Sequence, residues 1–202
     1  MKRIPYLRIT TVPMSLSYLL EGQPQFLKKN NFEVHLASSG SCPPDLSEFT
    51  FHSIPLSRTI SPIKDIKSIW RLKSILKKNK IEIIHSHTPK AGLIAMISAA
   101  LARTPVRLHT VAGLPQDHSA KLTSVILNIT ESITYLFSHK VYFNSITQME
   151  TQKVKFKRFS DKFAFIHNGT SNGIDLSRFS NTTSKSELRF KLKLDRDMFY
   201  WV

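Results

Sequence analysis

Short apolar segments rich in β-branched residues alternate along this chain with longer segments of helical periodicity, and this alternation restricts its fold more than any other feature. Parallel strands need a crossover connection, so strands separated by helices favour a parallel sheet. Right-handed crossovers place helices on both faces, which predicts an α/β fold with a doubly wound parallel sheet. The expected strands span residues 6–12, 32–37, 49–54, 81–85, 106–111, 141–143 and 163–166. The expected helices span residues 22–30, 61–79, 89–102, 122–137 and 147–156.

The end of the chain has a different composition. Residues 168–175 are polar and rich in Gly and Asn, which predicts a loop, and residues 184–192 predict a short helix. The apolar segment 198–202 resembles a buried strand, and the chain stops inside it. We therefore expect one domain over residues 1–175, followed over residues 176–202 by an interdomain linker and the start of a truncated second domain.

Basic residues dominate the charge, since 29 Lys and Arg against 14 Asp and Glu give a formal net charge of +15. Such an excess favours anionic partners, namely nucleic acid, acidic lipid or phosphate-bearing substrates. No recognised nucleic-acid-reading motif accompanies the charge, so we expect no nucleic-acid partner. The single cysteine, Cys42, excludes an internal disulfide and is typical of a reducing cytosol.

The helix expected at residues 61–79 concentrates positive charge, with Asp65 as its only acidic residue. Such a run usually forms a solvated face; the alternative is a surface that binds anionic lipid, at about 1 kcal/mol per basic residue. The longest apolar run, residues 91–102, is broken by Ser98 and is too short to cross a bilayer. We expect a cytoplasmic protein, and the lipid alternative would place it on the inner face of the cell membrane. The candidate membrane-docking residues are Lys64, Lys67, Arg71 and Lys78.

The segment HSHTPKAG, residues 85–92, lies where an expected strand ends and a helix begins. Ligands of open α/β sheets bind at such carboxyl ends of strands. A helix N-terminus there offers free amide donors to an anion or a sugar hydroxyl, and Lys90 in its first turn opposes the helix dipole. The structural alternative is that Thr88 caps the helix, Pro89 starts it and both histidines simply end the strand.

His85 and His87 form a His-x-His pair whose side chains share one strand face. Such pairs bind zinc in some hydrolases, which need further His or Asp ligands from other strand ends. His109 and Asp117 are candidates for that role, but no second ligand cluster stands out. A metal-dependent hydrolase using His85 and His87 stays open as an alternative, while our main expectation includes no metal and no cofactor.

His109, at the end of the next expected strand, is a candidate general base near neutral pH, or else a half-buried histidine bonded to a neighbouring carbonyl.

Gly22 precedes a helix, which is weak evidence for a phosphate contact. The loop that contains Asn168 and Gly169 is richer in backbone amides and fits either an anion-binding nest or an interdomain hinge. No Gly-x-Gly-x-x-Gly occurs, which disfavours a dinucleotide enzyme.

Several segments occur in the order found in one enzyme family. They are ITTVP at 9–13, GQ at 22–23, SP at 61–62, HSHTPKAG at 85–92, HTVAGLP at 109–115 and NGTSNGID at 168–175. Together they resemble the N-terminal half of family 4 retaining glycosyltransferases of the two-domain GT-B fold. The likeness is strongest to bacterial enzymes of capsule, O-antigen and exopolysaccharide assembly, and it extends from the first strand to Phe179.

The resemblance implies a Rossmann-like N-terminal domain that holds the acceptor and a C-terminal domain that holds the nucleotide-sugar donor. The implied partners are a nucleotide-diphosphate sugar, a lipid-linked saccharide and, in a split enzyme, a separate chain carrying the donor domain. The anionic membrane surface is expected from the basic helix at residues 61–79. The implied acceptor-binding residues are His87, Thr88 and Lys90, the implied catalytic residue is His109, and Gly22 is implied to lie beside the donor diphosphate. Asn168 and Gly169 are added as donor-diphosphate residues from the anion-binding nest described above, although the resemblance makes their loop the segment that joins the two domains.

The chain departs from the family pattern in two respects. Many relatives carry a histidine after the Thr-Val of the HTV segment, where this chain has Ala112, and His109 lies three positions earlier on a different strand face. The donor domain, with its acidic pair, is missing, so we expect the chain alone to be inactive. The alternatives within this fold are a non-catalytic remnant and a partner subunit of a split enzyme.

Overall fold

The computed structural model describes residues 2–57, 59, 61–113, 121–166 and 185–193. Contacts divide the chain into two compact units, Met1–Asn172 and Gly173–Val202. In the second unit the described part contains helix α7 (Lys185–Lys191), which confirms the helix expected at 184–192. The expected loop at 168–175 and strand at 198–202 lie outside the described residues. The division into domains 1–175 and 176–202 stays a prediction.

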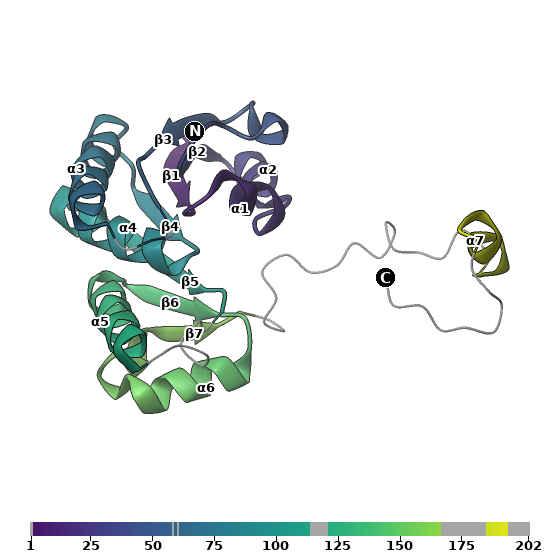
Figure 1. Ribbon diagram of the computed structural model, residues 1–202. Helices are drawn as coiled ribbons and strands as arrows, with labels where there is room; N and C mark the ends of the chain where they lie inside the picture. The colour runs from purple at the N-terminus through teal and green to yellow at the C-terminus, as the bar shows by residue number, and fades with distance from the viewer. Residues whose placement is uncertain (1, 58, 60, 114–120, 167–184, 194–202) are drawn as a thin grey trace. The chain divides into compact units, whose positions relative to one another are not determined.

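The first unit is built around a seven-stranded sheet in which each strand runs parallel to its neighbours (Figure 1). The strand order, β3-β2-β1-β4-β5-β6-β7, confirms the doubly wound parallel sheet. The order reverses between β1 and β4, which makes this pair the topological switch point, where ligands of such sheets bind. The strands are β1 (Ile4–Ile9), β2 (Phe32–Ser38), β3 (Thr50–Ser53), β4 (Ile83–Ser86), β5 (Val106–Val111), β6 (Lys140–Phe143) and β7 (Phe163–Phe165).

Helices cover both faces of this sheet. In Figure 1, α3, α4 and α5 lie along one side of the strands, and α1 and α2 lie on the other side of β1 and β2. Side chains alternate along each strand, so Leu7 and Ile9 pack in the core under α3 and α4, whereas Val34 and Leu36 pack with α1 and η1. The helices are α1 (Pro13–Tyr18), α2 (Gln23–Lys29), α3 (Pro62–Lys78), α4 (Pro89–Ala102), α5 (Lys121–Phe137) and α6 (Ile146–Lys155), with 3-10 helices η1 (Pro44–Leu46) and η3 (Lys157–Lys162).

The first strand and the segment after it differ from the expectation. β1 ends at Ile9, whereas the sequence pattern predicted a strand to residue 12. Beyond it Thr10 turns the chain, since its hydroxyl donates to the Val12 carbonyl at 2.9 Å. Pro13 then occupies the first position of α1, a short helix that the sequence analysis missed. Proline serves there because its missing N–H has no partner in the first helical turn.

The basic helix α3 exposes several large apolar side chains. Ser68, Leu72 and Leu76 form its buried side. On the outer side Ile63 is 85% exposed, and Ile66 and Trp70 are each 57% exposed. Among the described residues, no helix is both long and apolar enough to cross a bilayer.

Candidate functional site

The loops after β1 and β4 are tied together at the carboxyl edge of the sheet. The His87 amide donates to the Ile9 carbonyl at 3.2 Å. The hydroxyls of Thr11 and Thr88 lie 2.7 Å apart, and the Thr11 amide donates to Thr88 Oγ1 at 3.1 Å. These contacts join the HSHTPKAG segment to the chain after β1, at the switch point of the sheet.

Thr88 is therefore placed as an N-cap residue but does not cap the helix. It precedes Pro89 in an extended conformation, and its side chain makes no hydrogen bond to the helix amides. The interpretation of Thr88 as a simple helix cap is wrong, because its hydroxyl is used by Thr11. The first turn of α4 thus begins without a side-chain cap.

Lys90 has a protein partner that the sequence analysis missed. Its ammonium forms an ion pair with the Asp65 carboxylate and donates to the Thr59 carbonyl at 3.2 Å. Both side chains of the ion pair are mostly buried. Asp65, the only acidic residue on α3, thus holds the start of α4 against α3. Acceptor binding by Lys90 stays a prediction, and any acceptor would meet a lysine that is already paired.

His85 and His87 lie together on the face of the sheet opposite α4, with ring centroids 4.2 Å apart. The Tyr6 hydroxyl lies 2.9 Å from His85 Nδ1, and the Thr110 hydroxyl lies 2.8 Å from His85 Nε2. Arg8 Nη1 lies 2.8 Å from His87 Nε2. Burial lowers the pKa of both imidazoles well below the ordinary value, with the Arg8 charge adding to the effect.

This network does not support the metal-hydrolase hypothesis. Both ring nitrogens of His85 have hydroxyl partners, and His87 Nε2 accepts from a cation. Within the described residues, no group of three or more His, Cys, Asp or Glu side chains is arranged to hold a metal ion.

His109 lies on the other face, because its strand partner is Ser86 rather than His85 or His87. Its Nδ1 lies 2.8 Å from the Ser86 hydroxyl. Its ring packs against the backbone of α4, where a Cβ added to Gly92 would lie 2.6 Å from Cε1. Burial lowers the pKa of His109 to about 4, although a hydrogen bond between its ring and the Ser86 backbone opposes this shift. The catalytic role of His109 stays a prediction. In the structure its imidazole is neutral and packs against α4.

Of the three residues expected to contact the donor diphosphate, the structure describes only Gly22. Gly22 begins α2 with φ +74°, a conformation that side chains disfavour, and a Cβ there would meet no atom within 4 Å. Its surroundings are thus open, as a close approach by a ligand requires. Asn168 and Gly169 lie outside the described residues.

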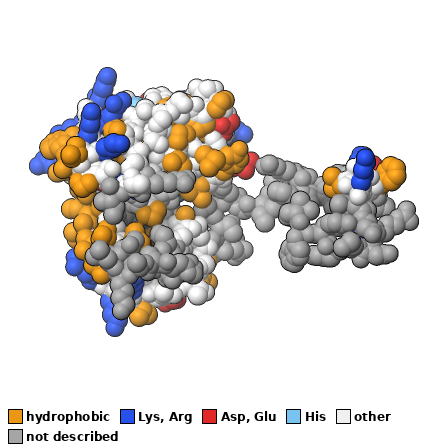
Figure 2. Space-filling model, viewed as in Figure 1, with side chains coloured by type: hydrophobic (Ala, Val, Ile, Leu, Met, Phe, Trp, Pro, Cys, Tyr) orange, Lys and Arg blue, Asp and Glu red, His pale blue; other side chains and the backbone are white. Residues whose placement is uncertain are grey.

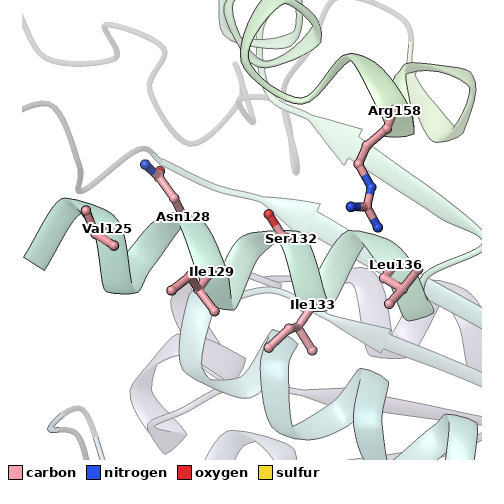
Figure 3. A pocket seen from close by; sticks show the side chains of 7 residues that line it. All are labelled: Val125, Asn128, Ile129, Ser132, Ile133, Leu136 and Arg158. Atoms are coloured by element: carbon pink, nitrogen blue, oxygen red, sulfur yellow. The ribbon is translucent and has the colours of Figure 1, made fainter.

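A small cavity and a larger groove occur in the described part of the chain. A small one, about 10 Å³, lies at the end of β5 and is lined by His109, Gly113 and Glu131 among others. A larger open groove, about 390 Å³, runs along the exposed side of α5 rather than over the carboxyl edge (Figure 3). Its lining residues are Val125, Asn128, Ile129, Ser132, Ile133, Leu136 and Arg158.

The four candidate membrane-docking residues on α3 are all exposed. Ile63, Ile66 and Trp70 lie on one side of the same helix, because residues three and seven positions apart share a face. Figure 2 shows apolar side chains with Lys and Arg beside them on the side of the molecule where α3 lies. The basic residues in question are Lys64, Lys67, Arg71 and Lys78.

The matched family and two similar proteins are all described as glycosyltransferases. Residues 12–147 match the family described as glycosyl transferase 4-like. The capsular polysaccharide biosynthesis glycosyltransferase CapM of Staphylococcus aureus is 30% identical over 98% of this chain and 52% of its own length. An Escherichia coli galactosyltransferase, named for UDP-galactose and N-acetylglucosamine-diphosphoundecaprenol, is 30% identical over 88% of this chain and 46% of its own length.

Solved structures agree with the fold. HepE of Anabaena, crystallised with UDP and glucose, superposes with a TM-score of 0.65 at 13% identity, over 94% of this chain and 50% of that one. The chain thus spans about half the length of the relatives that it matches. With the family match covering most of the described sheet, the chain belongs to the glycosyl transferase 4-like family.

Proposed function

We propose that this chain forms the acceptor-side half of a glycosyltransferase that builds cell-surface polysaccharide. The complete enzyme moves a sugar from a nucleotide-diphosphate donor to a lipid-linked saccharide. The observation that carries the proposal is the tied pair of loops after β1 and β4, which carries the HSHTPKAG segment at the switch point of a family 4-like sheet. The named substrates of the E. coli relative, a UDP-sugar and a diphosphate-linked lipid saccharide, support this pair of substrate classes.

The donor site needs groups beyond this chain, because the matched relatives are about twice as long. We propose that Gly22, with Asn168 and Gly169, faces the donor diphosphate, and that a second half binds the nucleotide, in the same polypeptide or in a separate one. The other candidates, a non-catalytic remnant and a partner subunit, share this fold and differ in whether that half is supplied.

Calorimetry tests the acceptor assignment. The titrants are N-acetylglucosamine diphosphate bearing a short isoprenyl chain, as acceptor analogue, and UDP-galactose. The chain alone is expected to bind the acceptor analogue and to bind UDP-galactose far more weakly. Tight binding of UDP-galactose without binding of the acceptor analogue contradicts the proposal.

We further propose that α3 docks the protein on the inner face of the cell membrane. The exposed side chains of Ile63, Ile66 and Trp70 enter the interfacial region, while the neighbouring lysines and Arg71 meet anionic headgroups. Tryptophan suits this position because its ring is apolar and its N–H is polar.

Vesicle binding tests this docking with a matched control. Removing two positive charges in K64S/K67S is expected to weaken binding to phosphatidylglycerol vesicles by about 2 kcal/mol, since each basic residue contributes about 1 kcal/mol. The control K155S/K157S removes the same charge from exposed positions near α6 and is expected to bind nearly as the parent does. In a W201F background, Trp70 fluorescence should shift to the blue on vesicles. Equal loss in both doublets, or no shift, contradicts docking through α3.

A further inference from the structure

The three helices on one side of the sheet carry no exposed acidic side chain. Helix α4 packs between α3 and α5, so these helices form one layer, called here the α3–α4–α5 layer (Figure 1). Its only acidic residues are Asp65 and Glu131. Asp65 is mostly buried in its ion pair with Lys90, and Glu131 is 7% exposed. Exposed acidic residues of the described chain lie outside the layer, among them Glu82, Glu150 and Asp161.

Helix α5 gives this layer a second exposed apolar surface, beside that of α3. Val125, Ile129 and Leu136 are each about half exposed. At about 100° per residue these three positions lie within about 40° of one another around the helix. With Ile133 they form the apolar part of the α5 groove. In Figure 2 hydrophobic and basic side chains, with no acidic ones visible, lie along the side of the first unit where Figure 1 shows α3 and α5.

The other edge of the α5 groove is polar and cationic. Figure 3 shows Arg158 reaching from η3 towards α5, on the side to which Ser132 points, whereas Ile129 and Ile133 point to the other side. Arg158 takes part in none of the ion pairs of the described residues, and its guanidinium carbon lies 4.5 Å from the centre of the Phe159 ring. No acidic side chain is among the described residues that line the groove. A molecule with an anionic head and a hydrocarbon chain is complementary to these two edges.

We propose that the α5 groove is a second membrane contact, which takes an acyl chain of an anionic phospholipid and places Arg158 at the lipid phosphate. The proposal rests on the proposed docking through α3 and extends it across the α3–α4–α5 layer. Positive charge of one sign beside exposed apolar side chains matches an anionic bilayer, whose headgroups are negative and whose interior is hydrocarbon. A protein that docks by both helices lies with this layer against the membrane. The start of α4, which carries the HSHTPKAG segment, belongs to the same layer and would meet an acceptor held in that membrane.

Vesicle binding tests the apolar edge of the groove. I129S/L136S is expected to bind phosphatidylglycerol vesicles about tenfold more weakly than the parent does, because both side chains lose apolar area that the bilayer would bury. The matched control is M14S/F26S, which removes exposed apolar side chains from α1 and α2, on the other side of the sheet. It should bind nearly as the parent does. Since all four positions are at the surface, the melting temperatures without vesicles should stay close to that of the parent.

A pair of neighbouring charges tests the cationic edge. R158S is expected to bind phosphatidylglycerol vesicles about fivefold more weakly than the parent does, which is the contribution of one basic residue at an anionic surface. K157S removes the same charge from the adjacent exposed residue, which does not line the groove, and should bind nearly as the parent does. Neither substitution should matter for phosphatidylcholine vesicles, which carry no net charge.

A fluorophore in the groove reports the contact directly. An environment-sensitive label is attached to the single cysteine of C42S/I129C or, as control, of C42S/F26C. The emission of the label at position 129 should shift to the blue on phosphatidylglycerol vesicles, and the emission of the label at position 26 should not. Equal shifts at the two positions would overturn a specific contact through α5.

The remaining outcomes separate this contact from the other proposals. If I129S/L136S and R158S bind vesicles as the parent does while K64S/K67S is weakened, the α5 contact is overturned and docking through α3 stands. If the label at position 129 responds without vesicles to the isoprenyl diphosphate analogue, or to rising protein concentration, the occupant is the acceptor chain or a second copy, and the bilayer proposal is overturned. Calorimetry with the acceptor analogue uses no vesicles, so a failure of the proposed function is read separately.

Discussion

Ser86 and His87 are neighbours in one motif, yet the two faces of the sheet give their side chains opposite surroundings. On the α4 face, Ser86 bonds to His109, whose ring fills the space left by Gly92, and the contacts are closed. On the other face, His87 and Arg8 hold buried donors that no described group accepts. Close packing of this kind is what folding alone requires, whereas buried donors without an acceptor are uncommon in folded proteins. One part of the motif therefore packs the sheet against α4, and acceptor binding by the other part, His87, stays a prediction.

The largest effect is expected at Gly92, where the sheet packs closely against α4. In G92A the new methyl group meets the His109 ring, so we expect a loss of about 1–3 kcal/mol despite the better helix propensity of alanine. The matched control is G113A, where a Cβ would meet nothing within 4 Å, and its change should stay within about 0.5 kcal/mol. Urea denaturation of both variants measures the difference. If G92A is as stable as G113A, the α4 face is not closed.

The buried imidazole of His109 predicts the next effect, which depends on pH. The folded state lowers its pKa to about 4 from 6.5, so the unfolded chain binds the proton more readily. Stability from this group is complete above pH 6.5 and is lost as the pH falls towards 4. Between pH 7 and pH 5 the parent should lose about 2 kcal/mol more than H109Q, which has no imidazole to protonate. The free energy of unfolding at the two pH values gives the answer, and equal losses in both proteins would show that His109 is not buried as described.

The smallest effect is expected for the ion pair that joins α3 to α4. A double-mutant cycle with D65N and K90M should give a coupling of about 1 kcal/mol, because the ion pair is mostly buried but keeps some solvent contact. If the coupling is near zero, Lys90 is free to serve the acceptor alone. In that case K90M should weaken binding of the acceptor analogue without affecting stability.

The order of the elements could be predicted from the sequence because periodicity is a local signal. The apolar runs at β4 and β5 and the Ser61-Pro62 and Thr88-Pro89 helix starts each lie within a few residues. Ser61 occupies the N-cap position of α3, although its side chain makes no capping hydrogen bond.

The side-chain contacts of the site could not be predicted in this way. Arg8 and His87 are 79 residues apart, Asp65 and Lys90 are 25 apart, and no local pattern pairs them. One indication that Asp65 has a specific partner was present in the sequence, because it is the only acidic residue on the basic helix α3. The strand-end positions of His87 and His109 also did not show that the two side chains lie near the same edge of the sheet but on opposite faces.

Mapping the bound acceptor analogue on the isotopically labelled chain tests the central claim most directly. Backbone amide signals are followed while N-acetylglucosamine diphosphate with its short isoprenyl chain is added. The account predicts that the largest shifts fall at residues 8–12 and 86–92, around the tied loops. Shifts confined to the α5 groove at residues 125–136, with the loops unmoved, would contradict it.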